Sequence, residues 1–461
     1  MTPARASLTR GPVGAHLRRM TVPMIWGILA MMSFNVVDTW FVAQLGAREL
    51  AAMSFTFPVV MTMMSVGIGL GAGASSVLAR AIGEGDPQRT RRLATDGLML
   101  ALLISGVLTA LGIATVDPVF GLLGAPAELL PLIRAYMVPW YAGLIFLIVP
   151  MVGMHSIRAT GDSRTPSRLM MAAALANIAL DPLLIFGLAG FPRLELVGAA
   201  YATLAVRVIP TAGVAWMFAR RLRLVTFERV GLRTIGASWL GVLHVGLPAA
   251  GTNVIIPLTN GVIVALVSGF GTAAVAGLGV ATRVEACALI IFYAMSAIIG
   301  PFVGQNLGAG RSDRILSALR QSFVFCLAWG AVLAVAVGAF ATPLAQLFSE
   351  AAQVVRVATQ YLWIVPASYG MAGIIMVANA SFNGLGKPIP ATLISVTRMV
   401  IVYLPLAYLG KVLWGVPGIF AAAALSNVAV GGAAALWSLG AARRRCTTTD
   451  VAADAAARAS A

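Results

Sequence analysis

The sequence predicts an all-α integral membrane protein with twelve transmembrane helices, arranged as two six-helix halves. Three observations support this fold class: the composition, a regular series of apolar segments and an internal repeat. Of the 461 residues, 59% are hydrophobic and 10% are charged, and the mean hydropathy is +0.91. This is more apolar surface than the core of a soluble protein buries, so the chain belongs in a lipid bilayer.

Apolar stretches of about 20 residues, the length that crosses about 30 Å of hydrocarbon, recur along the whole chain with short loops between them. They begin near Val22, Ala51, Leu93, Leu132, Leu169, Val197, Leu240, Ala273, Ser322, Tyr361, Ala391 and Val416.

The net charge of +16 is explained by where the basic residues lie. Arginine is concentrated in the N-terminus, in every second loop and in the tail. The other loops hold only Arg48, Arg134, Arg193, Arg356 and Lys411. Under the positive-inside rule both termini are then cytoplasmic, as in a multi-pass protein of the cell (inner) membrane. The basic charge is therefore a sign of topology, and we expect no nucleic-acid partner.

The domain organisation follows from these segments. We predict a cytoplasmic N-terminus at 1–20, an N-lobe of helices 1–6 at 21–218, a cytoplasmic linker at 219–238, a C-lobe of helices 7–12 at 239–440 and a disordered cytoplasmic tail at 441–461. The first apolar run is too long for a signal peptide and ends in no small-residue cleavage site, so we expect it to remain as the first helix. The scattered cysteines and histidines predict neither a disulfide framework nor a metal cluster.

An internal repeat relates the two halves. An offset of 225 residues aligns Pro23 with Pro248 and Asn35 with Asn260. The same offset pairs the glycines Gly46 with Gly271, Gly83 with Gly308, Gly85 with Gly310 and Gly161 with Gly386. Because each half has an even number of helices, both enter the membrane from the same side, and the repeat is parallel. A substrate should then lie between the halves, and the Arg-rich linker is long enough to let them rock.

Two carboxylates, Asp38 and Asp181, lie far inside apolar segments and mark the candidate site. At 1.5 Å per residue they lie about 24 and about 18 Å along their helices, at similar depths. A charge at mid-membrane costs about 2.5–3.5 kcal/mol, so such acids usually serve ion or proton movement. Neither recurs in the second half, where the repeat offset places Ile263 and the neighbourhood of Leu404. A transporter is therefore predicted, with the ion site in the N-terminal half.

An asparagine accompanies each carboxylate on its helix face. Asn35 lies three residues before Asp38, and Asn177 lies four residues before Asp181. The four side chains offer oxygen ligands, which suit a hard monovalent cation or a proton taken by one of the two carboxylates. The alternative is a hydrogen-bonded polar pair that locks two helices together. No cofactor is predicted beyond Na⁺ or H⁺ as the coupling ion.

Two prolines are candidate hinges. Pro23 lies near the start of the first helix, where proline is tolerated or kinks the chain. Pro182 follows Asp181 directly and should break its helix locally, which is tolerated in a membrane where the backbone lines a cavity. A simple packing kink is the alternative at both positions.

A rival coupling site is Glu285, in the eighth segment. Arg283 lies two residues away and therefore on another face of the helix. A structural pairing of Glu285 with polar neighbours is the alternative. Arg207 and Arg398 are also intramembrane, and either could be the counter-ion of a carboxylate, which the sequence alone does not pair.

Several functions are excluded or disfavoured by missing motifs. Gly67, Gly69, Gly71 and Gly73 lie in an apolar helix with no strand before them, so they predict close helix packing and no dinucleotide loop. The chain has no GxxxxGK[ST] motif and no set of nucleophile, base and oxyanion donors. We therefore predict no enzyme, and the energy must come from an ion gradient or another chain.

The chain resembles the multidrug and toxic compound extrusion (MATE) family over about residues 10–440. The motifs that carry the resemblance are V-D-T-W-F-V-A-Q-L-G (37–46), A-R-A-I-G-E-G-D (79–86), R-A-T-G-D-S-R-T-P (158–166), N-I-A-L-D-P (177–182), G-A-A-Y-A-T (198–203), V-G-Q-N-L-G-A-G (303–310) and N-G-L-G-K-P (383–388).

This resemblance implies a V-shaped twelve-helix fold and export of organic cations against Na⁺ or H⁺. In prokaryotic members coupled through the N-lobe, the site would correspond here to Asp38, Asn177 and Asp181, with Tyr136 and Thr203 beside them, and the first-helix bend would fall at Pro23. Norfloxacin-exporting bacterial members have acidic residues in the seventh and tenth helices. This chain has only Asn253, Asn260, Asn379 and Asn383 there.

The predicted function is therefore secondary active efflux of organic, mostly cationic or amphipathic compounds by antiport with Na⁺ or H⁺. The first rival is a lipid-linked saccharide flippase of the same superfamily, which would need a basic cavity such as Arg207, Arg283 and Arg398 could supply. A channel is disfavoured because the carboxylates do not repeat in both halves. We expect small organic substrates and membrane lipid as partners, and a monomer, since a cavity between two internal halves needs no second chain.

Overall fold

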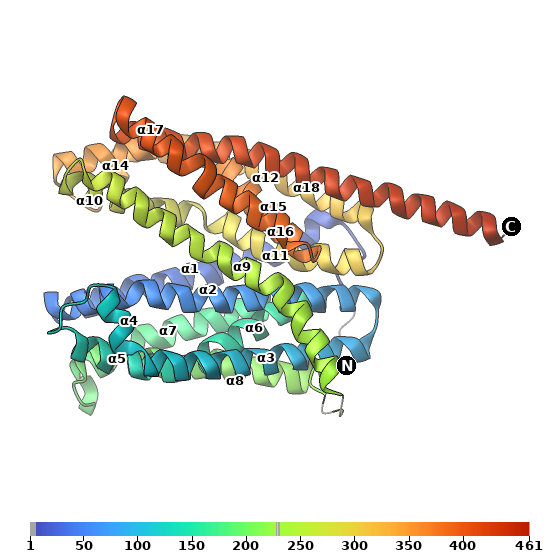
Figure 1. Cartoon of the computed structure of the whole chain (residues 1–461), viewed down its shortest axis with the longest axis horizontal. Coiled ribbons are helices and arrows are strands. Elements are labelled where there is room, and N and C mark those ends of the chain that lie inside the picture. Colours follow the sequence, from blue (N-terminus) through green and yellow to red (C-terminus); the bar gives the residue numbers. More distant parts are fainter. Residues whose placement is uncertain (1–5, 227, 229–230, 461) are drawn as a thin grey trace. The chain divides into compact units, whose positions relative to one another are not determined.

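The structure, a computed structural model, describes residues 6–226, 228 and 231–460, and these residues form helices joined by short loops (Figure 1). Residues 1–5 of the predicted N-terminus, 227 and 229–230 of the predicted linker, and Ala461 lie outside the described part. Eleven helices there are long and apolar enough to cross a membrane. The pair Leu130–Ala142 and Ile145–Ala159, bent by 44°, makes a twelfth span. The predicted membrane architecture is confirmed.

The chain divides into two compact units, each with its own helix packing. Unit 1 comprises Val22–Ala250, and unit 2 comprises Ser7–Thr21 together with Gly251–Ala461. Two helices belong to both units: α1 (Val13–Ala43) and α9 (Leu232–Ser268). The other helical segments of unit 1 are α2 (Ala47–Glu84), α3 (Pro87–Ala114), α4 (Val116–Leu122), α5 (Leu130–Ala142), α6 (Ile145–Ala159), α7 (Arg164–Phe186), η1 (Leu188–Gly190), α8 (Glu195–Trp216) and η2 (Met217–Arg221).

Unit 2 repeats this order of elements. The short helix α4 and the broken pair α5 and α6 return as α13, α14 and α15, at nearly the 225-residue offset. The segments of unit 2 are α10 (Thr272–Ala288), α11 (Ile290–Gly308), α12 (Ser312–Ala339), α13 (Ala341–Gln346), α14 (Ala352–Ile364), η3 (Val365–Ser368), α15 (Tyr369–Gly384), α16 (Pro388–Val396), η4 (Thr397–Tyr403), α17 (Leu404–Trp414) and α18 (Val416–Ser460).

The paired glycines of the repeat have a conformational reason. Gly85 and Gly310 end equivalent helices with φ of 78° and 69°, and Gly161 and Gly386 end another pair with φ of 92° and 69°. These left-handed conformations are costly for residues with a Cβ, so glycine recurs in both halves where a helix must stop. The short loops depend on these stops.

The unit boundaries differ from the predicted lobe boundaries. Residues 239–250, predicted to open the C-lobe, pack in unit 1, and residues 7–20 of the predicted N-terminus pack in unit 2. The reason is that α1 and α9 are each longer than one span and cross from one unit to the other. Helix α1 begins in unit 2 and continues in unit 1, whereas α9 begins in unit 1 and continues in unit 2. Pro23 and Pro248 lie within three residues of the two changeover points.

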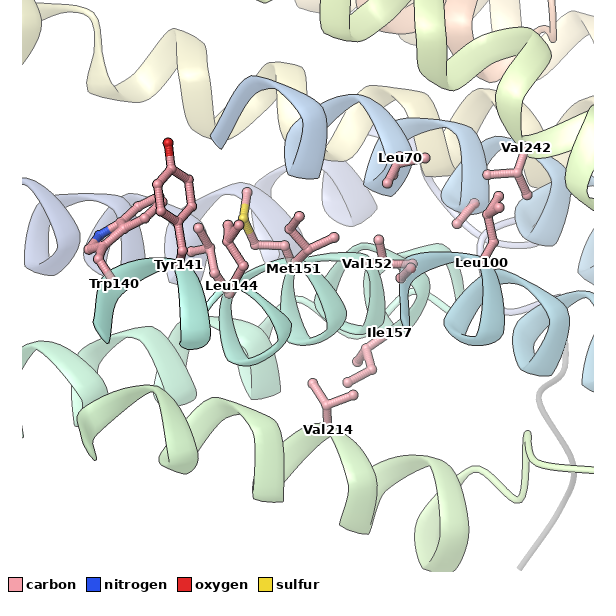
Figure 2. Packing of buried hydrophobic residues seen from close by; sticks show 14 of the residues in the cluster. Leu70, Leu100, Trp140, Tyr141, Leu144, Met151, Val152, Ile157, Val214 and Val242 are labelled. Atoms are coloured by element: carbon pink, nitrogen blue, oxygen red, sulfur yellow. The ribbon is translucent and has the colours of Figure 1, made fainter. Parts of the chain in front are cut away.

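The core of unit 1 is built around the broken span. Trp140, Tyr141 and Leu144 at the bend between α5 and α6, and Met151 and Ile157 further along α6, are buried (Figure 2). They pack with residues of α2, α3 and α8, such as Leu70, Leu100 and Val214. This interior fixes α5 and α8, which carry two of the site residues described below.

The glycine series of α2 is a helix-packing surface, as predicted. A Cβ on Gly69 or Gly73 would overlap the backbone of α9 at Gly246 or Val242. Gly71 lies in the same way against the ring of His155. The two helix backbones therefore approach closely, and they do so because α2 has no side chain at these positions.

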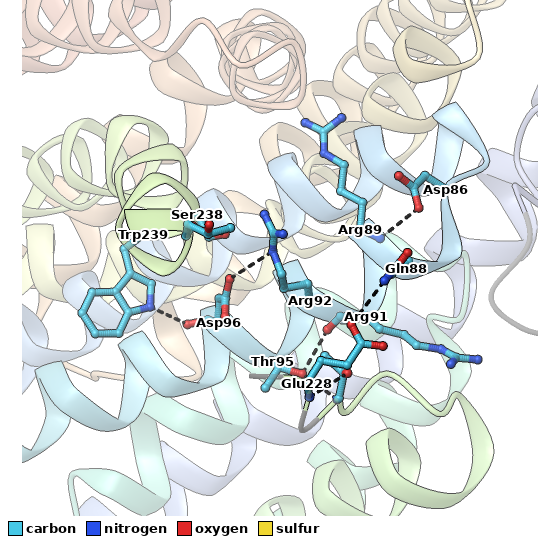
Figure 3. Close-up of polar contacts among 12 residues, drawn as sticks. Asp86, Gln88, Arg89, Arg91, Arg92, Thr95, Asp96, Glu228, Ser238 and Trp239 are labelled. Atoms are coloured by element: carbon cyan, nitrogen blue, oxygen red, sulfur yellow. Dashed lines mark hydrogen bonds and ion pairs between the residues drawn. The ribbon is translucent and has the colours of Figure 1, made fainter. Parts of the chain in front are cut away.

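The loop between η2 and α9, which holds part of the predicted linker, lies within unit 1 and is tied to α3 (Figure 3). Thr226 N donates to Thr95 Oγ1 at 3.0 Å, and Gln88 Nε2 donates to Glu228 Oε2 at 3.3 Å. The indole Nε1 of Trp239, near the start of α9, donates to the Asp96 carbonyl at 2.9 Å. Most of the predicted free linker is thus docked on unit 1 or helical.

The N-terminal segment is held to unit 2 by buried polar side chains. Arg314 donates to the carbonyls of Gly11 at 2.7 Å and Leu8 at 3.1 Å, and to Asn306 Oδ1 at 2.9 Å. Gln305 Oε1 accepts from Leu8 N at 3.1 Å. Gln305 and Asn306, two polar residues of the 303–310 motif, therefore serve an anchoring role.

The predicted disordered tail is helical in the structure. Helix α18 continues to Ser460. The stretch is rich in alanine, the strongest helix former, and it continues a membrane helix, so no new nucleus is needed.

Candidate functional site

The candidate ion site lies in unit 1, where three helices bring four of the predicted residues together. Asp38 on α1 and Asp181 on α7 are close enough to repel each other electrostatically, and Tyr136 on α5 interacts with both. Asn177 lies one turn before Asp181 on α7 and beside its carboxylate. The structure thus places Asp38, Asn177, Asp181 and Tyr136 in one cluster.

The cluster is buried and its polar atoms are unsatisfied. The exposed fractions of Asp38, Asn177 and Asp181 are 7%, 1% and 0%. Among the described residues, Asp38 Oδ1, both oxygens of Asp181 and both amide atoms of Asn177 have no hydrogen-bond partner. A buried polar group without a partner costs free energy, and a buried carboxylate costs far more. These oxygens are therefore free to accept a hydrogen bond or to coordinate a hard cation.

A guanidinium offsets part of the negative charge of the cluster. Arg207 on α8 interacts electrostatically with Asp38 and Tyr136, and its Cζ lies 5.1 Å from the centroid of the Trp140 ring. It forms no salt bridge within the described part of the chain. With every group ionised, the two carboxylates and the guanidinium sum to −1 (−2 + 1), so one monovalent cation makes the cluster neutral. Arg207 is therefore a counter-charge to Asp38, a pairing that the sequence did not supply.

The other two predicted residues are an exposed asparagine, Asn35, and Thr203 on α8, the helix that also carries Arg207. Asn35 is exposed, and its Nδ2 donates to the Met31 carbonyl of its own helix at 2.9 Å. Thr203 lies one turn before Arg207 on α8, and no hydrogen bond of its side chain is found among the described residues. A shared helix face is a coarse guide, because three residues are about 300° of rotation and the helix can bury one side chain while exposing the other.

The two prolines lie inside continuous helices. Helix α7 runs unbroken through Pro182, so the predicted local break is not observed. Proline still has no N–H for the carbonyl four residues before it, so the helix loses one hydrogen bond beside the site. Pro23 lies inside α1, next to the point where that helix passes from unit 2 to unit 1.

The rival residue, Glu285, belongs to a separate polar cluster in unit 2. Its Oε2 accepts a hydrogen bond from the hydroxyl of Tyr361 at 2.5 Å. Arg398 interacts with it electrostatically, and Arg398 NH1 donates to Asn427 Oδ1 at 3.2 Å. Arg283, two residues from Glu285, is exposed on another face, as predicted. Glu285 therefore has both a hydrogen-bond donor and a counter-charge.

The sequence contained a signal for this second cluster. The repeat offset of 225 residues, which we applied to prolines, glycines and asparagines, also pairs Tyr136 with Tyr361. Each repeat thus places an equivalent tyrosine beside its charged cluster. Arg398 falls on the repeat counterpart of α7, opposite Ala173 and one turn before Asn177.

Twelve membrane-length spans in two repeated units, with buried charges inside them, define a multi-pass membrane transporter. A family model matches each repeat separately, at residues 23–183 and 248–409, and its description is MatE. The chain belongs to this family, whose members are transporters and not enzymes. The two matches begin 225 residues apart, so they also confirm the internal repeat.

Relatives cover most of the chain. It is 39% identical over 93% of its length to the FAD transporter of Shewanella oneidensis, 94% of which is covered. It is 27% identical over 82% of its length to the probable multidrug resistance protein YoeA of Bacillus subtilis, 81% of which is covered.

A solved structure agrees with the fold. The MATE transporter VcmN of Vibrio cholerae, in a crystal structure described as the bent form, is 32% identical and superimposes with a TM-score of 0.89, over 96% of this chain and 98% of that one.

Proposed function

We propose that this protein is a secondary antiporter that exports small organic compounds in exchange for H⁺ or Na⁺ at the Asp38 and Asp181 cluster. The observation that carries the proposal is the set of buried, unpartnered oxygens on Asp38, Asn177 and Asp181. Oxygens of this kind suit a hard cation, and either carboxylate can instead take a proton. If Na⁺ is the ion, these three residues would hold it.

Antiport follows if ion and substrate compete for the same negative charge. A cationic substrate is attracted to the cluster while both carboxylates are ionised, and a bound H⁺ or Na⁺ cancels the net charge of −1. The ion then weakens substrate binding, and linkage requires that the substrate weakens ion binding equally. Rocking of the two units would complete the cycle. The bound ion would drive the change in one direction, and the bound substrate would drive the change back.

The first candidate substrates are cationic or amphipathic organic compounds. The charge of the cluster supports this choice, as do the names of relatives such as the YoeA protein. We expect the coupling ion to enter from outside the cell. We also expect a monomer in the inner membrane, surrounded by lipid, with both chain termini in the cytoplasm.

A second candidate substrate is FAD, or a similar flavin nucleotide. It is supported by the 39% identity to the Shewanella oneidensis FAD transporter. FAD is an anion, so the ionised carboxylates of unit 1 would repel it. The two candidates therefore require opposite charges of the binding surface, and an experiment can separate them.

The test is efflux from proteoliposomes under an imposed Na⁺ gradient or an imposed pH gradient, with ethidium as the cationic probe and FAD as the anionic one. Wild type is compared with Asp38→Asn, and with Asp117→Asn, whose aspartate pairs with Arg134 at 2.5 Å outside the cluster. Efflux driven by one gradient, lost in Asp38→Asn and kept in Asp117→Asn, is expected. Equal efflux in both variants would contradict the proposal. Folded protein without efflux under either gradient would favour the flippase.

The topology and the oligomeric state have their own tests. A reporter that is active only in the cytoplasm should be active when it is fused to either end of the chain. Light scattering of the purified protein should give one chain per particle.

A further inference from the structure

The polar cluster of unit 2 has properties that ion coupling in unit 1 does not use. Arg398 donates to Asn427 Oδ1 at 3.2 Å, and Asn427 Nδ2 donates to Ser368 Oγ at 3.0 Å. Glu285 is held separately, by Tyr361. The positive and the negative group are thus fixed by different partners.

The guanidinium of Arg398 has donors to spare. It carries five N–H groups in a planar fork. Among the described residues, it donates to one oxygen, that of Asn427, and to the sulfur of Met399 at 3.2 Å, and it forms no salt bridge. Placing an arginine within a membrane-spanning helix costs free energy, so such residues usually have a function. The unused N–H donors of Arg398 could bind a ligand.

The backbone at Arg398 is also unusual. The residue lies in η4, a π-helical stretch between α16 and α17, and Ser426 Oγ donates to its carbonyl at 2.8 Å. Wide turns of this kind inside helices occur frequently at functional sites. This observation is independent of the side-chain contacts.

Aromatic rings surround the charged groups. Tyr293 and Tyr403 interact electrostatically with Arg398, and Tyr293 is 45% exposed. The Tyr361 ring packs edge-on against Phe420, with 4.9 Å between the centroids. The hydroxyl of Tyr369, which is fully buried, has no hydrogen-bond partner among the described residues. Tyrosine rings near a guanidinium suit contact with a planar organic ring that carries an acceptor group.

We propose that unit 2 contains a binding site for the phosphate group of an aromatic organic substrate, with Arg398 as the phosphate ligand and Asn427 as the residue that orients it. A guanidinium pairs with two phosphate oxygens at once, which gives both strength and direction. The proposal deepens the second candidate of the proposed function and rests on it. A lipid phosphate shares the anionic chemistry, but the tyrosines near Arg398 favour a soluble ligand with a ring.

The first experiment measures binding by quenching of flavin fluorescence, with FMN and riboflavin as probes, because they differ by one phosphate. Wild type should bind FMN at least about tenfold more tightly than riboflavin, as expected for charge-assisted hydrogen bonds. Arg398→Gln should lose this preference and keep its riboflavin affinity, whereas Arg398→Lys should retain part of it, because a point charge replaces the fork.

The matched control is Arg283→Gln, which removes an exposed guanidinium on another helix face of unit 2 and should keep the FMN preference. Equal binding of FMN and riboflavin by wild type would overturn the proposal. So would loss of the preference in Arg283→Gln, or loss of both flavins in Arg398→Gln.

A second experiment separates the sources of phosphate. In nanodiscs, FMN binding should be the same in phosphatidylcholine and in phosphatidylcholine with phosphatidic acid. Displacement of FMN by phosphatidic acid would assign the site to lipid and overturn the proposal. Gradient-driven ethidium efflux by Arg398→Gln should match that of wild type, so failure of this site and failure of antiport are distinguishable.

Discussion

Each unit has a charged cluster beside an equivalent tyrosine of the repeat, Tyr136 or Tyr361, but the charged residues come from different repeat positions and their balance differs. Unit 1 has two carboxylates and one guanidinium, with five side-chain atoms of Asp38, Asn177 and Asp181 left without hydrogen bonds. Unit 2 has one carboxylate and one guanidinium, and each has a hydrogen-bond partner. The carboxylates of unit 1 keep oxygens without donors, whereas the carboxylate of unit 2 has both a donor and a counter-charge. This difference supports the proposal that the coupling ion binds in unit 1.

The sharpest way to break this comparison is to neutralise one carboxylate in each unit. Asp181→Asn removes a charge from the unsatisfied cluster, and we expect gradient-driven efflux to fall by about 100-fold or more, since ion and substrate lose their shared group. Glu285→Gln keeps an acceptor for Tyr361, and efflux should change by less than about threefold. Initial efflux rates from proteoliposomes, normalised to folded protein, are the measurement. A larger loss in Glu285→Gln would move the coupling site to unit 2.

The units also differ in how they hold the helix that starts on them. Unit 1 receives α9 through the glycines of α2, so Gly73→Leu should destabilise the protein by about 3 kcal/mol through overpacking against Val242. Gly106→Leu, on α3, meets open space and should change stability by less than about 0.5 kcal/mol. Thermal unfolding in detergent measures both. Equal midpoints in the two variants would mean that the close approach of α2 and α9 is not important for stability.

Unit 2 holds the N-terminal segment through polar contacts instead. Arg314→Leu removes three hydrogen bonds made by a charged group, and we expect a local loss of about 2 kcal/mol. Faster hydrogen exchange at residues 7–21, with the rest of unit 2 unchanged, is the expected result. Arg311→Gln is the control, because that side chain is exposed and, in the described part of the chain, forms an ion pair only with Asp313. Unchanged exchange in Arg314→Leu would show that other contacts anchor the segment.

The smallest effect should come from the guanidinium of unit 1. Arg207→Gln changes the net charge of the cluster from −1 to −2, which strengthens cation binding by about tenfold for one charge at close range. The ion concentration that gives half-maximal efflux should fall accordingly. The same substitution at Arg398 should leave this concentration unchanged. An unaltered concentration in Arg207→Gln would show that its charge is screened from the carboxylates.

The sequence by itself determined the membrane class, the number of spans, the repeat and three residues of the candidate ion cluster. These features depend on local properties: segment length, hydropathy, a fixed offset and the rarity of carboxylates in apolar helices. Glycines that end helices belong to the same group, because left-handed backbone is a requirement of one position.

Only the tertiary structure decided which charges face each other. From the sequence, either Arg207 or Arg398 could be the counter-ion of a carboxylate. Packing placed Arg207 with Asp38 and Arg398 with Glu285. Packing likewise separated Asn35 from Asp38 and moved the unit boundaries into the interiors of α1 and α9. The physical reason is that the direction of a side chain depends on helix rotation and on neighbours distant in the chain, which spacing along one helix does not encode.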